Sequence, residues 1–455
     1  MIHDLITQSM AILPEIILAA GLIAVLTLSL FNISFISKNT GWISLLFYAL
    51  SLYFLFTQND SGFFFSRSVY ITSSSVFFRI LIILTGAAAA ILAEYSSETK
   101  QISRPELNLL IMGSVLGGMF MTIASNMITL YLSIEFISLL SYLLTGITFQ
   151  RGKSLEAAVK YAIYGGVSSG IMLFGMSFLY GITGSIYFDS LLNEIQFGSF
   201  AHRIMLITGT AFFIAGLGYK LAAVPFHTWC PDVYEGASVP VTYFFIAPRI
   251  AGFAVILQVF NAVFQQNLSG EFIFQAIAVL SALTMTLGNF SALNQTGIKR
   301  LLAYSSIAHG GYALALFSVT KTRIDPSLVY YMAAYFLMTG GTFIIFQILS
   351  EDGEGDLSLF NGLAFRGKGG VFLSAVMAGF AFSLIGIPPF SGFMGKYLIF
   401  AHLIEDGNYW LAVTMGFNTI LSIYYYMKFL HHSYFFKSQE SKPVSIPIPV
   451  YLILA

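Results

Sequence analysis

The chain has 455 residues, of which 57% are hydrophobic and only 9% are charged, and its mean hydropathy is +0.81. A soluble globular protein has about a quarter charged residues, so this composition excludes that class and indicates a polytopic helical protein in a lipid bilayer. The 21 basic and 21 acidic residues balance, which excludes a strongly basic surface for nucleic acid.

Apolar runs of about 20 residues predict membrane-spanning helices. We predict fourteen such helices, of which the last is cut short. They lie near residues 10–31, 41–57, 76–95, 106–125, 127–148, 157–181, 203–223, 239–262, 272–294, 299–318, 326–349, 370–401, 409–430 and from 444 onward. The first run contains Pro14 and Glu15 and has no basic segment before it, so we interpret it as a retained helix and not as a signal peptide.

Lysine and arginine predict the orientation, because they accumulate in loops on the cytoplasmic side of a membrane. More of them lie after odd-numbered runs, as at Lys100, Arg104, Arg151 and Lys153, than after even-numbered runs. We therefore expect a multi-pass protein with its N-terminus outside.

Two apolar runs are interrupted by proline. Pro225 follows the seventh run, and Pro388 and Pro389 divide the run at 370–401. Interrupted helices in corresponding positions of two halves indicate a transport site at a repeat interface. Because the breaks lie five helices apart, an odd number, the halves would be inverted in the membrane. An offset of 170 residues supports the repeat by pairing Tyr142 with Tyr312, Val159 with Val329 and Tyr161 with Tyr331.

These features divide the chain into four expected segments. The first is an N-terminal three-helix segment at residues 1–105, and the second is a five-helix repeat at 106–262. A second, inverted repeat covers 272–430, and 431–455 begins a truncated C-terminal helix. The seventh and twelfth helices are the broken ones.

Charged residues inside apolar runs are the candidates for function, since a charge in hydrocarbon costs at least about 2.5 kcal/mol. Glu135 lies near the middle of its run, and Lys220 lies just before the first break. We predict that the two face each other, so that a change in their separation makes the lysine bind or release a proton. The alternative is a static ion pair that orients two helices.

Three further residues extend this candidate path. Lys396 follows the second break, and His309 lies well inside a run, where an imidazole that titrates near neutral pH suits a proton relay. Arg249 keeps its proton in proteins, so it can set a potential but cannot pass on its own proton. The alternatives are snorkelling of Lys396 to the interface and a structural, hydrogen-bonding role for His309.

Other polar residues near the runs have simpler interpretations. Glu156 and Lys160 are four residues apart on one helix face and form a neutralising pair, although Lys160 stays a secondary candidate. His227 caps the broken helix or gates an outlet. Asp232 and Glu235 are expected to be solvated loop acids.

Two charges near the N-terminal helix starts have similarly simple explanations. Arg79 is expected to snorkel to the membrane interface. Glu15, directly after a proline, suits the first turn of a helix, where a carboxylate meets the positive end of the helix dipole.

Cysteine content and motifs limit the chemistry of the chain itself. The single cysteine, Cys230, excludes an internal disulfide and an iron–sulfur cluster held by cysteines of this chain. No phosphate-binding loop or dinucleotide fingerprint follows a strand pattern. We therefore expect no ATP or redox cofactor in this chain.

Three motifs follow one another along this fourteen-helix layout, and they read SLEAAVKYAIYG, GLGYKLAAVPFHTWCPDVYEGASVPVT and NQTGIKRLLAYSSIAHGGY. Together they resemble the N-subunit family of proton-pumping NADH–quinone oxidoreductase, respiratory complex I. The segment PFHTWCPDVYEG is similar to the N-type subunit rather than to its L and M siblings or to the related cation/proton antiporter subunits.

The resemblance implies an all-α, antiporter-like fold with two inverted five-helix repeats and broken seventh and twelfth helices. It also implies a membrane-arm proton channel, so that the chain is one subunit of a translocase in the inner membrane of a bacterium. NADH, FMN, iron–sulfur clusters and quinone would belong to partner subunits. The implied neighbours are an antiporter-like subunit and small subunits of the membrane arm.

By motif, the functional residues of the family fall on Glu135, Lys220, Lys396 and the basic position of the eighth helix. The family has a Ser-Lys pair at that last position, whereas this chain has Pro248 followed by Arg249. We therefore predict that His309 and water carry the proton past Arg249, which supplies a fixed charge.

Two other functions are compatible with the sequence. A subunit of a multisubunit sodium/proton antiporter shares the fold, and a structural subunit could stabilise the membrane arm without conducting. The charges of Glu135, Lys220 and Lys396 argue against the structural role, whereas Arg249 fits a partly disabled channel.

Overall fold

The computed structural model describes residues 8–30, 34–58, 61–100, 102–191, 200–264, 271–319, 324–350, 352–436, 443–444 and 446–454. In these ranges the chain is almost entirely helical, with one short antiparallel hairpin. It forms two compact units. Unit 1 comprises Met1–Ala90, Gln101–Leu221 and Ala247–Ser269, and unit 2 comprises Ile91–Lys100, Ala222–Ile246 and Gly270–Ala455.

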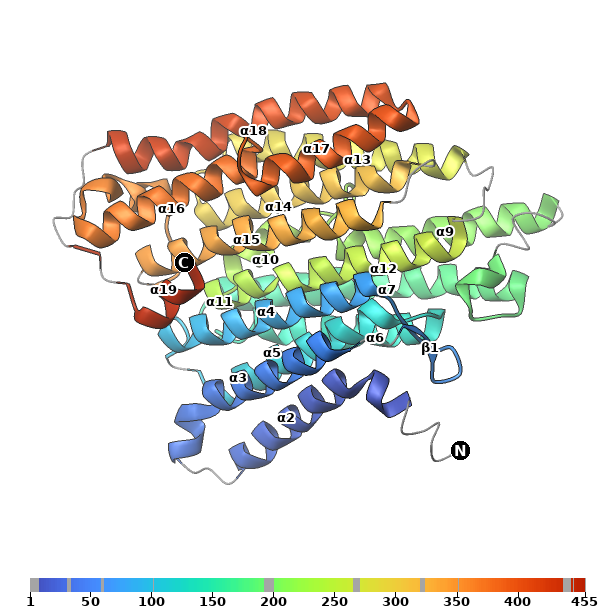
Figure 1. Ribbon diagram of the computed structural model, residues 1–455, viewed down its shortest axis with the longest axis horizontal. Helices are drawn as coiled ribbons and strands as arrows, with labels where there is room; N and C mark the ends of the chain where they lie inside the picture. Colours follow the sequence, from blue (N-terminus) through green and yellow to red (C-terminus); the bar gives the residue numbers. More distant parts are fainter. Residues whose placement is uncertain are drawn as a thin grey trace. The chain divides into compact units, whose positions relative to one another are not determined.

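Unit 1 is a helix bundle in which α7 packs along α9, α5 packs along α6, and α2 packs against α3 and α5 (Figure 1). Its elements are α2 (Leu13–Leu30), α3 (Ser34–Thr57), β1 (Gly62–Phe64), β2 (Val69–Ile71), most of α4 (Ser73–Tyr95), α5 (Arg104–Ile123), α6 (Met127–Thr145), α7 (Gly152–Thr183), η1 (Phe188–Ser190), α9 (Phe200–Lys220) and α12 (Ile246–Phe264). In the hairpin Phe63 pairs with Tyr70.

Unit 2 is also a helix bundle, in which α13 packs along α14 and α16 packs along α18 (Figure 1). Its elements are α10 (Trp229–Gly236), α11 (Val239–Phe244), α13 (Glu271–Leu293), α14 (Ile298–Ala315), η2 (Leu316–Ser318), α15 (Asp325–Leu349), η3 (Leu357–Phe360), η4 (Leu363–Phe365), α16 (Gly367–Ile385), α17 (Ser391–Asp406), α18 (Tyr409–Phe435) and α19 (Ile448–Leu454).

The membrane character predicted from composition is confirmed by the length and hydropathy of the helices. In the described ranges, ten helices are long and apolar enough to cross a membrane. The count of fourteen spans and the four segment boundaries stay predictions. The compact units are divided differently from those segments, because residues 222–246 pack with unit 2 although they precede the predicted boundary at 262.

Both predicted helix interruptions are present. α9 ends at Lys220, and the chain passes Pro225 before α10 begins. α16 ends at Ile385, and α17 begins at Ser391, after the two prolines. Proline removes a backbone donor and prevents the helix from continuing through these positions. Gly386 closes α16 with φ of 90°, a left-handed conformation that glycine adopts without strain.

A third interruption divides the run that we predicted as one helix over 239–262. α11 ends at Phe244 and α12 begins at Ile246. Pro248 has no N–H to donate to the carbonyl four residues earlier, that of Phe244, so the helical ladder is broken here. Arg249 directly follows this proline and lies in the first turn of α12, which begins at Ile246.

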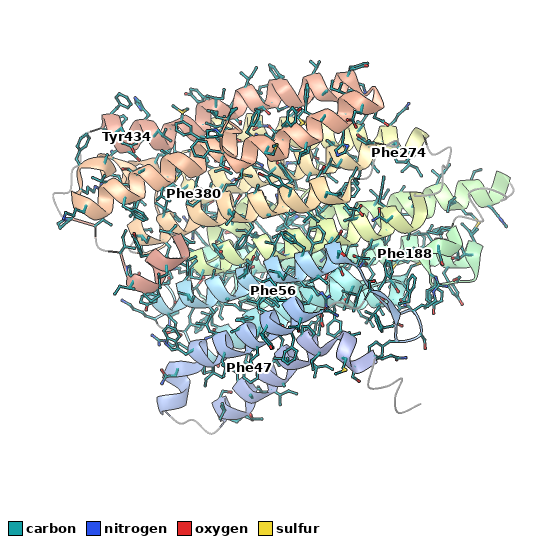
Figure 2. The ribbon with its side chains drawn as sticks, viewed as in Figure 1. Phe47, Phe56, Phe188, Phe274, Phe380 and Tyr434 are labelled. Atoms are coloured by element: carbon teal, nitrogen blue, oxygen red, sulfur yellow. The ribbon has the colours of Figure 1, made fainter. Side chains whose placement is uncertain are left out.

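Glycines let aromatic side chains of neighbouring helices lie against the backbone. A Cβ atom at Gly21 of α2 would lie 2.4 Å from Cγ of Phe47 on α3, and one at Gly341 of α15 would lie 2.1 Å from Cζ of Phe380 on α16. Figure 2 labels both phenylalanines among the side chains of the bundle. Such close contacts are typical of membrane helices, which associate by packing of small residues.

Arg79 does not snorkel to the surface, so that expectation is wrong. Its Nη1 atom lies 2.9 Å from Oε1 of Glu15, and the side chains of both residues are 0% exposed. Nη2 of Arg79 donates to Oε1 of Gln58 at 2.8 Å. The buried ion pair connects α2 with α4, and Gln58, the residue after α3, joins them. Each charge needs the other once it is removed from water.

Candidate functional site

Glu135 projects from α6 and is only partly exposed. Its Oε1 atom accepts a hydrogen bond from the hydroxyl of Ser169 on α7. A hydroxyl donor stabilises a carboxylate in apolar surroundings. α6 therefore presents a partly buried acid whose hydrogen-bond partner is a neutral hydroxyl.

Lys220 is the last residue of α9, at the first interruption. Its amine donates to Oγ of Ser138, which lies three residues after Glu135 on α6 and therefore on nearly the same helix face. Glu135 interacts with Lys220 electrostatically, but the two do not form an ion pair within 4.0 Å. The predicted neighbourhood is present, with Ser138 in the place of a direct salt bridge.

Tyr142 completes this group of unit 1. Nζ of Lys220 lies 5.8 Å from the centroid of the Tyr142 ring, a distance at which a cation is attracted to an aromatic face. A Cβ atom at Gly165 of α7 would lie 1.8 Å from the Tyr142 hydroxyl, so this ring reaches the backbone of α7. The glycine that ends the motif SLEAAVKYAIYG thus makes room for the ring next to the lysine.

Arg249 lies on α12 and is 4% exposed. Three residues later, a Cβ atom at Gly252 would lie 2.7 Å from Cδ2 of Leu221, the residue after Lys220. This close approach brings α12 against the end of α9. A permanent guanidinium charge is thereby held on a helix that contacts the neighbour of Lys220.

In unit 2, Lys396 projects from α17 back toward the end of α16. Its amine donates to the carbonyl oxygens of Leu384 and Ile385 at 3.1 and 2.9 Å, and the residue is 6% exposed. Carbonyls at a helix C-terminus attract a cation because they carry the negative end of the helix dipole. The alternative that Lys396 snorkels to the surface is wrong, because its amine is buried and hydrogen bonded to carbonyls at the end of α16.

Tyr312 faces the amine of Lys396 as Tyr142 faces that of Lys220. Nζ of Lys396 lies 4.5 Å from the centroid of the Tyr312 ring. These are the two tyrosines that the offset of 170 residues pairs in the sequence. At the same offset, the counterpart of Glu135 is Ser305, so the carboxylate of the first group is replaced by a hydroxyl in the second.

His309 lies on α14 and is 2% exposed. Nδ1 of its ring is 2.7 Å from the hydroxyl of Tyr331 on α15, and Nε2 is 3.2 Å from the hydroxyl of Tyr426 on α18. The Tyr426 hydroxyl in turn hydrogen bonds with the hydroxyl of Ser305. Since hydroxyls and imidazoles both donate and accept, this row of groups can pass a proton.

A second polar row lies beside Tyr312 and holds its hydroxyl. Nδ2 of Asn289 donates to Oη of Tyr312 and to Oδ1 of Asn418, both at 3.1 Å. The hydroxyl of Tyr425 donates to Oδ1 of Asn289 at 2.9 Å. Tyr425 and Tyr426 are adjacent in α18, so this helix contributes to both rows.

The two secondary candidates have different surroundings. Nζ of Lys160 lies 2.7 Å from Oε1 of Glu156, with side chains 39% and 66% exposed, which confirms the predicted pair. His227 lies in the segment between α9 and α10, and its buried Nδ1 atom has no hydrogen-bond partner.

Asp232 and Glu235 are not loop acids, and that expectation is wrong. Both belong to α10, and their carboxylates lie 3.0 and 2.8 Å from Nη1 of Arg300 on α14. They sit one helical turn apart, so that one guanidinium reaches both. The pair of carboxylates therefore fastens α10 to the start of α14.

Several residues of these groups were absent from our sequence-based candidates. Ser138 could have been found as the polar residue one turn after Glu135, and Tyr331 as a member of the 170-residue offset. Ser169 and Tyr426 have no such local signal, because their partners are distant in sequence. In the described ranges, no group of three or more His, Cys, Asp or Glu side chains could hold a metal ion.

Residues 124–422 match the family described as NADH:quinone oxidoreductase/Mrp antiporter, TM. An NADH-quinone oxidoreductase subunit N from Anaeromyxobacter sp. is 40% identical over 78% of this chain and 73% of its own length. The subunit N from Trichlorobacter lovleyi is 33% identical over 98% of this chain and 92% of its own.

A solved structure has the same fold. A chain of respiratory complex I from Thermus thermophilus, with bound aureothin, superposes with a TM-score of 0.82 at 29% identity. The similarity covers 97% of this chain and 94% of that one.

Proposed function

From the premise that the chain belongs to the family of NADH-quinone oxidoreductase N subunits, we propose that it moves protons as a membrane-arm subunit. The driving reactions, NADH oxidation and quinone reduction, take place in partner subunits. The chain itself contributes a path of titratable side chains. The observation that carries this proposal is the placement of a lysine at each of two helix interruptions, each facing a tyrosine ring.

The first half of the path is formed by Glu135 and Lys220. Their serine partners leave the carboxylate and the amine close enough to interact electrostatically without locking them in a direct ion pair. A small movement of α6 against α9 therefore changes their interaction. Because a nearby carboxylate favours the charged form of an amine, that movement makes Lys220 bind or release a proton.

The second half is formed by His309 and Lys396. Lys396 has carbonyl oxygens and a tyrosine ring around its amine, which stabilise its charge less than a carboxylate does. It is therefore suited to give up its proton. The hydroxyls of Tyr331 and Tyr426 orient the His309 ring and connect it to further hydroxyls, which supports proton passage along α14.

Arg249 is the fixed charge of this path. It stays protonated, so it acts on its neighbours through its potential and does not carry the transferred proton. The proton passes by way of His309 and water. We further propose that the two halves are inverted five-helix repeats, since equivalent tyrosines face both lysines.

The assembly follows from the same proposal. The chain is one subunit of a proton-translocating enzyme, and NADH, FMN, iron–sulfur clusters and quinone belong to other subunits. Its neighbours in the bilayer are an antiporter-like subunit and small membrane-arm subunits. We propose the bacterial cytoplasmic membrane, with the N-terminus outside, as its location.

The test uses membranes from cells that lack this chain and from cells complemented with it. Loss of NADH–quinone activity on deletion supports the proposal, whereas unchanged activity together with lost sodium/proton exchange would support the antiporter alternative. In complemented membranes, Lys220→Met and Lys396→Met are expected to assemble and to lower the number of protons moved per NADH severalfold. Lys368→Met, an exposed lysine at the start of α16, is the matched control and should pump normally.

A further inference from the structure

The junction between α10 and α11 leaves two helix ends close together in the chain. α10 ends at Gly236, and α11 begins at Val239, so only Ala237 and Ser238 separate them. The last carbonyls of α10 and the first N–H groups of α11 have no partner within their own helices. A cation at the end of α10 and an anion at the start of α11 would therefore both be stabilising.

A lysine and a glutamate from elsewhere in unit 2 occupy these ends. Nζ of Lys299, on α14, donates to the carbonyl of Ala237 at 2.7 Å and to that of Glu235 at 3.4 Å. Oε2 of Glu98, in the segment after α4, accepts from the backbone N–H of Val239 at 2.8 Å. The cation thus meets the negative end of α10, and the carboxylate meets the positive end of α11.

The two charges are also partners of each other. Nζ of Lys299 and Oε1 of Glu98 are 3.9 Å apart, and their side chains are 7% and 1% exposed. A Cβ atom at Gly353 would lie 1.9 Å from Cδ of Glu98, so the chain closes over the carboxylate. Removal of either charge would leave the other buried without its counter-charge, which is costly.

The elements held in this way surround His309. Lys299 and His309 are both on α14. On α11, Tyr243 packs against Gly340 of α15, where an added Cβ would lie 3.0 Å from the ring, and α15 also carries Tyr331, the partner of His309. The start of α11 is therefore held against α14, which carries His309, and against α15, which carries its partner Tyr331.

We propose that Glu98 and Lys299 form a helix-end clasp, a positioning pair that sets α10 and α11 against α14 and α15 so that the His309 row of hydroxyls stays connected. This inference rests on the proposed proton path. The clasp is directional, because the sign of each charge is matched to one helix end. An ion pair that only joined two segments would work equally well with its charges exchanged.

The direction of the clasp gives a sharp test in the assembled complex. Glu98→Gln is expected to assemble and to lower the number of protons moved per NADH severalfold, while Lys299→Arg, which keeps a cation at α10, retains most of the pumping. The exchanged pair, Glu98→Lys with Lys299→Glu, should not restore pumping. It places a cation at the positive start of α11 and an anion at the negative end of α10. Glu106→Gln makes the same change at an exposed carboxylate in the first turn of α5 and should pump normally.

A backbone variant covers the case in which Glu98→Gln fails to assemble. Val239→Pro removes the N–H that Glu98 accepts, and proline is tolerated at the first position of a helix. It should lower pumping as Glu98→Gln does, and the double variant should be no worse than either single one. Normal pumping in Val239→Pro or Glu98→Gln, or full recovery in the exchanged pair, would overturn the clasp.

His309→Ala and Lys220→Met are measured in the same membranes. If they reduce pumping and the clasp variants do not, the clasp alone is wrong. If they pump normally, the proposed proton path is wrong.

Discussion

Nη1 of Arg79 lies 2.9 Å from Oε1 of Glu15, and both side chains are completely shielded from solvent. The pair joins α2 to α4 in the N-terminal part of unit 1, and Gln58 supports it from the end of α3. The second carboxylate oxygen of Glu15 and Nε of Arg79 have no hydrogen-bond partner. The pair therefore depends on its single direct contact and on the contact between Arg79 and Gln58.

Glu15→Gln should destabilise the N-terminal helices by about 3–5 kcal/mol, because it leaves the Arg79 guanidinium buried without a counter-charge. Thermal unfolding of the purified complex, followed by release of this subunit, measures the effect. The double variant Glu15→Leu with Arg79→Met should recover much of the loss, since an apolar pair of similar volume avoids the unpaired charge. A single variant as stable as the wild type would contradict the structural role of the pair.

Ser138→Ala should lower proton pumping with little effect on assembly, because it removes the hydroxyl that accepts from the Lys220 amine. A hydrogen bond to a charged group is worth about 1.5–3 kcal/mol, which corresponds to a change of roughly tenfold or more in a proton equilibrium. The measurement is the ratio of protons moved to NADH oxidised in membranes with equal amounts of complex.

Ser141→Ala is the matched control for Ser138→Ala. The Ser141 hydroxyl is also buried on α6 and donates to a backbone carbonyl, that of Ile137, at 2.7 Å. No charged side chain accepts from it or donates to it in the described contacts. Equal losses in both variants would mean that the effect comes from α6 packing and not from Lys220.

The sequence analysis located the lysines and the breaks but not their partners. Proline and a charge in an apolar run each leave a local signal, so Lys220, Lys396 and both interruptions could be placed from the chain alone. Glu15 and Arg79 are 64 residues apart, and nothing in either run indicates the other. The sequence predicted that Glu135 and Lys220 face each other, but not that each has a serine partner, because the packing of α6, α7 and α9 decides those contacts.

The interruption before Arg249 was visible in principle. Pro248 stands inside the apolar run at 239–262, as Pro388 and Pro389 stand inside the run at 370–401, but we predicted 239–262 as one continuous helix. Apolar composition predicts that a segment lies in the membrane, but it does not predict whether the helix there is unbroken. Hydropathy therefore predicted the span correctly and missed its division into α11 and α12.

Tyr331→Phe should reduce pumping, because it removes the hydroxyl 2.7 Å from Nδ1 of His309 and leaves that nitrogen without this partner. A fast proton transfer requires the ring to be oriented, so the variant should approach His309→Ala in its ratio of protons to NADH. Tyr48→Phe is the control, since its buried hydroxyl has no hydrogen-bond partner to lose. If His309→Ala lowers pumping while Tyr331→Phe does not, proton passage would not require this hydroxyl.

Substitutions of Arg249 distinguish two explanations of how the proton passes between the two halves of the path. Its guanidinium is permanently charged and 4% exposed. If that step needs a basic group that releases its proton, Arg249→Lys should preserve or raise pumping. If Arg249 supplies only a potential, Arg249→Lys should weaken coupling modestly and Arg249→Ala should abolish it. We expect the second pattern, because a guanidinium does not pass on its own proton, whereas the His309 row provides groups that can pass one. The ratio of protons moved to NADH oxidised, measured with assembly checked, distinguishes the two patterns. A fully coupled Arg249→Ala variant would show that the charge on α12 is dispensable, and a fully coupled His309→Ala variant would remove the histidine from the path.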